Sequence, residues 1–194
     1  MTENVYRHTL ATSEINQLRN LIGEELRFVG GENLDAYSLA ESIVVSTDSG
    51  GTKISCGLTD GDFEGFEDEY PIFMARKASA VEIKKIEDLG NVNLSLSGSR
   101  ISGVTLVREI ITCKLLGETS WMLESDIGLV IHFKHAAVSF VNLTDYDIVC
   151  RLSVHSNFEP SDLPSTKTLQ ENDLVNSYEV SRALLPLTKE APVA

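Results

Sequence analysis

Basic residues are scarce in this chain relative to acidic ones. Sixteen lysines and arginines oppose 29 aspartates and glutamates, which gives a net charge of −13 at pH 7. A surface of this sign repels phosphate backbones and anionic lipid headgroups. We therefore expect neither nucleic acid nor a membrane surface as a partner.

Long apolar runs and abundant cysteine are also missing. No stretch approaches the roughly 18 apolar residues of a membrane-spanning helix, and the opening MTENVYRHTL lacks the basic and apolar regions of a signal peptide. Cys56, Cys113 and Cys150 are an odd number of widely spaced residues, each within an apolar stretch. Because disulfide frameworks belong to oxidising compartments, we expect a cytoplasmic protein with three reduced, mostly buried thiols.

Motifs that carry chemistry are absent as well. His132 and His135 form an H-x-x-H, but on a strand this spacing places the two side chains on opposite faces. No further ligand follows at the spacing of a zinc site, so we interpret both as ordinary hairpin residues. His8 and His155 belong to no recognisable triad, and neither G-x-S-x-G nor a phosphate loop occurs. The sequence therefore assigns no catalytic, cofactor-binding or metal-binding residue, and it gives no support to an enzymatic function.

What is present is the composition of a folded domain. Hydrophobic residues make up 42% and charged residues 23% of 194 residues, which suits one globular domain over residues 1–194. Residues 22–56 align with residues 106–140 at a constant offset of 84. This alignment suggests two similar packed halves, about 20–86 and 104–155, followed by a proline-containing segment 156–194. The alternative is that any two strand–turn–strand segments share apolar alternation.

Short alternating runs and tight turns outnumber helical patterns. We predict an α+β fold of predominantly antiparallel sheet, because the runs in 42–56 and 128–141 each resemble a hairpin. An N-terminal helix is predicted from residue 14 onward, capped by Thr12 or Ser13. Residues 81–89 fit either a short helix or a strand, and residues 173–185 fit a C-terminal helix.

The most unusual stretch is LTDGDFEGFEDEYP, residues 58–71, which holds six carboxylates and no base. An EF-hand loop starting at Asp60 would need a bidentate glutamate at its twelfth position, where Pro71 stands, so the calcium interpretation fails. In the alignment of the two halves the offset falls from 84 to 76 across this segment, so the first half carries eight extra residues here. Insertions between strands lie on the surface. We predict that it binds a partner through the following residues: Asp60, Asp62, Phe63, Glu64, Phe66, Glu67, Asp68 and Glu69.

Three classes of function remain open. The first is an acidic protein-binding module for a basic protein partner, because complementary charge speeds association and sets specificity. Bacterial immunity proteins that neutralise basic toxins by direct binding are small, acidic, cytoplasmic and poor in motifs, and this chain has the same profile. The second is a small-molecule-binding or enzymatic domain with a ligand between the two halves. The third is a structural or assembly subunit whose strand edges pair with neighbours.

Overall fold

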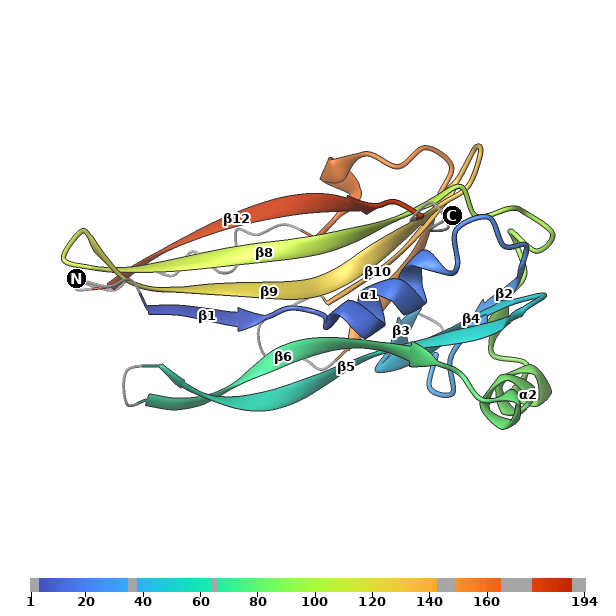
Figure 1. Ribbon diagram of the computed structural model, residues 1–194, viewed down its shortest axis with the longest axis horizontal. Coiled ribbons are helices and arrows are strands. Elements are labelled where there is room, and N and C mark those ends of the chain that lie inside the picture. Colours follow the sequence, from blue (N-terminus) through green and yellow to red (C-terminus); the bar gives the residue numbers. More distant parts are fainter. Residues whose placement is uncertain (1–3, 35–37, 64–65, 143–148, 165–175, 190–194) are drawn as a thin grey trace, which may run out of the picture.

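The protein consists of two β-sheets packed face to face, and two helices lie against the second sheet (Figure 1). The computed structural model describes residues 4–34, 38–63, 66–142, 149–164 and 176–189; for residues 60–71 and residue 176 it describes the backbone. Neighbouring strands are antiparallel apart from one parallel pair. The predicted α+β class with predominantly antiparallel sheet is confirmed.

The first sheet has the strand order β12-β8-β9-β10-β11-β3 within the described residues, and β1 pairs in parallel with β9. Its strands, in chain order, are β1 (Asn4–His8), β3 (Leu39–Ala40), β8 (Gly103–Leu115), β9 (Glu118–His132), β10 (Ala137–Asn142), β11 (Cys150–His155) and β12 (Asn176–Leu187). Strands β1 and β10 share one edge of β9, because β9 is long enough to pair with β1 along 121–125 and with β10 along 128–132.

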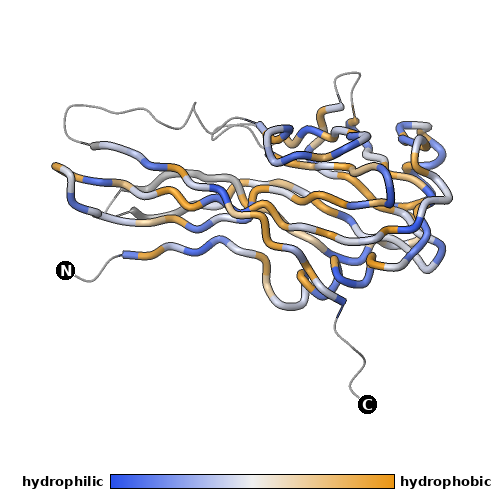
Figure 2. The backbone as a smooth tube through the Cα atoms, turned by 90° about the horizontal axis from the view of Figure 1, so that it is seen from above, coloured by the Kyte–Doolittle hydropathy of each residue, from blue (hydrophilic) through white to orange (hydrophobic). Residues whose placement is uncertain are grey.

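The second sheet has the order β6-β5-β4-β2-β7. Its strands are β2 (Leu26–Gly30), β4 (Ser42–Thr47), β5 (Gly50–Phe63), β6 (Phe66–Lys77) and β7 (Val92–Asn93). The main core lies between the sheets, where Leu106, Ile131 and Phe140 of the first sheet belong to one buried cluster with Val45 and Ile54 of the second. Figure 2 shows hydrophobic and hydrophilic residues alternating along the strands, as expected when one face of each strand is buried.

Two helices cover parts of the second sheet. Helix α1 (Thr12–Arg19) starts after Ala11, and no side chain caps it in the way predicted for Thr12 or Ser13. Instead the Glu14 carboxylate accepts hydrogen bonds from the backbone N–H of Ala11 at 2.8 Å and of Ala75 at 3.0 Å. One side chain therefore closes the first turn of α1 and also covers a backbone donor on the edge strand β6.

Helix α2 (Ala80–Leu89) resolves the ambiguity of residues 81–89 in favour of a helix. Ser79 accepts a hydrogen bond from the Glu82 N–H, and the Glu82 carboxylate accepts one from the Ser79 N–H, which is the reciprocal capping box. Gly90 ends the helix with φ of 71°. The positive φ favours glycine at this position.

The predicted C-terminal helix is wrong. Of the predicted residues 173–185, the first three lie outside the described residues. Residues 176–187 form β12, which pairs along its whole length with β8, from Asn176 opposite Leu115 to Leu187 opposite Val104. Local helical spacing is overridden here by pairing with a strand about 70 residues earlier.

The internal duplication stays a prediction. Each predicted half supplies four successive antiparallel strands to one sheet, β2-β4-β5-β6 in the second sheet and β8-β9-β10-β11 in the first. The first half also contains β3, which pairs with β11 in the sheet of the other half. Successive antiparallel strands are a common arrangement, so this order does not require a repeat. Tyr37, which the offset of 84 aligns with Trp121, lies outside the described residues.

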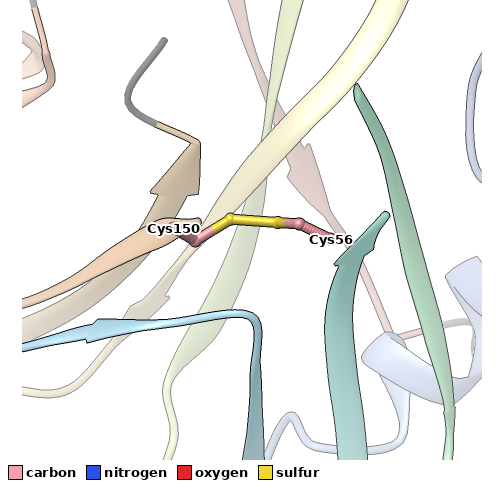
Figure 3. Close-up of a disulfide and its surroundings, with 2 residues drawn as sticks. All are labelled: Cys56 and Cys150. Carbon is pink, nitrogen blue, oxygen red and sulfur yellow. A yellow bond between two sulfur atoms is a disulfide. The ribbon is translucent and has the colours of Figure 1, made fainter. Parts of the chain in front are cut away.

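The expectation of three reduced thiols is wrong for two of them. Cys56 on β5 and Cys150 on β11 form a disulfide that joins the two sheets (Figure 3). Cys113 forms no disulfide and is buried, as predicted. The two bonded cysteines are 94 residues apart in sequence, and their contact depends on how the sheets stack, so local sequence patterns cannot indicate the pair.

Candidate functional site

The acidic segment forms the outer part of a long hairpin instead of a connecting loop. Strands β5 and β6 stay paired past the core, through seven further rungs from Gly57 opposite Ile72 to Phe63 opposite Phe66. We call residues 58–71 the acidic hairpin. Of the predicted partner-binding residues, Glu64 lies outside the described residues, and the other seven lie on β5 or β6 with only their backbone described: Asp60, Asp62, Phe63, Phe66, Glu67, Asp68 and Glu69.

The register of this hairpin sets acidic residues opposite one another. Asp60 is paired with Glu69, and Asp62 with Glu67. Like charges at directly opposed positions of an antiparallel pair are destabilising. The sequence supplies no lysine or arginine between residues 58 and 71, so the hairpin carries this repulsion without a base of its own.

A second hairpin ends at the same end of the molecule. Figure 1 shows the turn between β8 and β9 on the left, the end of β5 and the start of β6 also on the left, and α2 at the opposite end. The β8–β9 turn consists of Leu116 and Gly117, because Leu115 and Glu118 form the last pair of the ladder. Leu115 is 45% exposed and Leu116 is 81% exposed. We call residues 115–118 the leucine turn.

Aromatic side chains stiffen the strands that carry the leucine turn. Trp121 on β9 packs edge-on against Tyr6 of β1, with ring centroids 6.5 Å apart, and lies 6.1 Å from the ring of Tyr178 on β12. These contacts link both outer strands to the central hairpin. Trp121 is half-buried.

An ion pair reinforces the base of the same strands. The Arg108 guanidinium on β8 donates to both carboxylate oxygens of Asp126 on β9, at 2.8 and 3.2 Å. Asp126 is 1% exposed and also accepts a hydrogen bond from the Leu10 N–H at 2.8 Å. The hydrogen bond to the carboxylate raises the pKa of Arg108 above its usual value. A buried carboxylate satisfied in this way fixes where the chain leaves β1 and enters α1.

Two histidines lie on the outer face of the first sheet, the face turned away from the second sheet. His132 is 2.9 Å from the Thr105 hydroxyl through its Nε2, and His155 makes an edge contact with Phe158, whose ring also contacts His132. Burial lowers the pKa of His132. His135, the other member of the H-x-x-H, is exposed in the β9–β10 turn. Within the described residues no cluster of three or more His, Cys, Asp or Glu is placed to hold a metal ion.

A serine, a histidine and an aspartate form a chain of polar contacts, which the sequence did not reveal. The Ser139 hydroxyl is 2.8 Å from His155 Nε2, and His155 Nδ1 is 3.7 Å from an Asp162 carboxylate oxygen. Ser139 is only 5% exposed, and it lies on β10 between β9 and β11. Backbone N–H groups in a central strand donate hydrogen bonds to the neighbouring strands. The backbone at Ser139 therefore offers no N–H group to stabilise an oxyanion. The arrangement fastens residues 156–164 to the sheet and lacks the features of a nucleophilic site.

A crevice lined mainly by apolar residues lies between the two sheets. It is lined by Leu26 and Val29 of the second sheet and by Val138, Leu152 and Val154 of the first, and it has no room to enclose a water molecule. A drug-sized ligand needs a cavity of about 300–1,000 Å³. This crevice therefore does not support the prediction of a small-molecule site between the halves.

Comparison of the chain with protein-family models, with curated proteins and with solved structures found no match. Among the described helices none is both long enough and apolar enough to cross a membrane.

Proposed function

We propose that the protein is a binding module for a basic protein partner, which it contacts through the acidic hairpin. The observation that carries the proposal is the register of β5 and β6, which sets Asp60 opposite Glu69 and Asp62 opposite Glu67. A cationic surface that binds the hairpin relieves the repulsion between its carboxylates. This relief adds to the free energy of binding. The immunity-type function, direct neutralisation of a basic toxin, is the specific form of this proposal.

The hairpin is suited to this role by its position. It continues beyond the pair formed by Cys56 and Phe73, which is the last pair in the main core cluster among the described side chains of this hairpin. The disulfide at Cys56 joins this rung to the opposite sheet. The acidic hairpin therefore projects from a cross-linked base, and a projecting charge of one sign attracts a partner of the opposite sign over about 8–10 Å in physiological salt.

A charge-matched pair of variants tests the proposal. The first changes the six carboxylates of the hairpin to Asn or Gln, which moves the net charge from −13 to −7. The second makes the same change at six exposed or half-buried carboxylates elsewhere on the described surface and reaches the same net charge: Glu24, Glu25, Glu41, Asp48, Asp88 and Glu159. Association rate and its salt dependence are measured for proteins that the wild-type chain retains from its host lysate.

We expect the hairpin variant to associate more slowly and with a flatter salt dependence, whereas the control variant keeps most of the wild-type rate. The reason is that steering depends on the charges that lie near the contact. Equal rates and salt slopes for the hairpin variant and the wild type would show that the acidic hairpin is only a solvated extension.

A cytoplasmic location is part of the immunity-type proposal, and the disulfide provides its test. Thiols in the cytoplasm are kept reduced by glutathione and thioredoxin, so a bond between Cys56 and Cys150 is unusual there. If the protein trapped by rapid alkylation in its host carries this bond, then the location is an oxidising compartment and the cytoplasmic form of the proposal fails. The proposed binding through charge is independent of that result.

A further inference from the structure

The leucine turn combines two features that are each unfavourable in a free protein. Leu116 has φ of 53° and Gly117 has φ of 88°. A two-residue hairpin turn with both φ values positive is of type I′, in which Asn, Asp or Gly is normal at the first position. A leucine there is strained, because its Cβ approaches the following carbonyl oxygen.

The same residue is also the most exposed large hydrophobic side chain of the described part, at 81%. An exposed leucine on its own needs no explanation. A leucine that is both strained and exposed does need an explanation, because an asparagine at this position would remove the strain and the exposed apolar side chain together. A backbone outlier of this kind is typical of functional sites.

The support beneath the turn gives Leu116 a fixed position. The β8–β9 hairpin is flanked by β12 on one side and β1 on the other, and the rings of Tyr6, Trp121 and Tyr178 connect these strands. Lys114, beside the turn, is held in an ion pair with Glu179 of β12 at 2.5 Å. An anchor carried on a stiff support loses little conformational freedom on binding.

We infer that Leu116 is an apolar anchor that inserts into a pocket of the same basic protein that the acidic hairpin attracts. This inference rests on the proposed function and adds to it the second contact. The partner is a protein, because the chain's charge of −13 disfavours anionic lipid and would oppose a second copy of the chain. Its pocket is apolar with a basic rim, since the leucine turn and the acidic hairpin lie at one end of the molecule (Figure 1).

The sharpest variant is Leu116→Asn. It creates the usual Asn-Gly turn and removes the apolar side chain. The inference therefore predicts that stability rises while affinity for the partner falls. The melting temperature should rise by about 2–4 °C as the turn strain is relieved, while affinity for the partner should fall at least about tenfold. A purely structural role for Leu116 predicts instead that the melting temperature falls.

Contact is detected by photocrosslinking within the host cells. A benzophenone amino acid replaces exposed Glu118, next to the turn, in the wild-type chain and in the Leu116→Asn chain; a control chain carries it at exposed Lys84 on α2, at the opposite end. We expect an adduct with a basic protein from position 118, no such adduct from position 84, and loss of the adduct in Leu116→Asn. The inference is overturned by an adduct that survives Leu116→Asn, by the absence of any adduct at 118, or by an adduct with an acidic protein or a second copy.

Kinetics with the crosslinked partner separate this inference from the proposed function. An anchor acts on dissociation, so Leu116→Asn should speed dissociation and leave the salt slope unchanged. The six-fold hairpin variant should do the reverse, slowing association and flattening the salt slope. Failure of the first result alone overturns the anchor, and failure of the second alone overturns the acidic contact. Val81→Asn, which alters a side chain 77% exposed on α2, should change neither rate.

Discussion

Replacing both bonded cysteines with alanine should destabilise the protein strongly. The bond between Cys56 and Cys150 closes a loop of 94 residues. In the chain-entropy model, a loop of about 100 residues corresponds to about 4.7 kcal/mol of stability, and measured losses for native disulfides are about 2–5 kcal/mol. Both side chains are buried, Cys150 completely, so the lost sulfur contacts add to the effect. We expect the free energy of unfolding to fall by about 3–5 kcal/mol.

Urea unfolding of the double variant measures this loss, with Cys113→Ala as the control. Cys113 is buried at 3% exposure and forms no disulfide, so its variant reports the removal of one buried sulfur without opening a loop. Alkylation gives an independent result. Wild-type protein denatured without reductant should take up one maleimide, at Cys113, and three after reduction. Uptake of three without reductant, or equal urea midpoints for the double variant and the control, would refute the cross-link between the sheets.

Three further predictions concern single contacts. Gly128→Ala should destabilise the protein by more than about 2 kcal/mol, because a Cβ there would lie 2.6 Å from a carbonyl oxygen of β10. Gly57→Ala, whose Cβ would lie nearest the flexible end of a methionine and at ordinary contact distance from Ile72, should be close to neutral by urea unfolding. Glu14→Ala should cost about 1–3 kcal/mol because two backbone donors lose their acceptor, and Ser13→Ala, which removes no cap, should cost almost nothing in the same assay. Burial lowers the pKa of His132, so the unfolded chain binds a proton at this residue more readily than the folded protein does. The contribution of His132 to stability is therefore full above about pH 6.5 and is lost as the pH falls. His132→Gln should make the free energy of unfolding depend less steeply on pH between pH 7.5 and 5.5.

Most strands and one helix follow from local patterns in the sequence. The hairpins around Asp48 and Lys134 and the helix after Ala11 formed where alternation, turn residues and helical spacing indicated. These signals are local and agree with the tertiary contacts. Strand β12 was missed because its pairing partner, β8, is distant in sequence, and the local spacing of its apolar residues also fits a helix.

The candidate site was only partly predictable. The charge of the acidic hairpin is evident from composition, but its extended pairing is not, because Gly61 and the aspartates beside it are poor strand formers that follow the ladder begun by Thr52 and Lys77. The leucine turn left a usable signal in Leu116-Gly117 between two alternating runs. That signal does not by itself predict a turn, because leucine is not a residue expected at the first position of a type I′ turn.

The two strands that flank the β8–β9 hairpin affect how the chain folds during its synthesis. Strand β1 is synthesised before β8 and β9, yet it pairs with residues about 117 positions later, whereas β12 is synthesised after both. The 55 residues between His132 and Leu187 take about 3–11 s to translate at 5–20 residues per second. During that interval one long edge of β8 has no strand beside it, and open edges are where nascent chains pair wrongly. Ribosome-bound chains that end between β11 and β12 are therefore the stage at which a chaperone, or slow translation, would matter most to this protein.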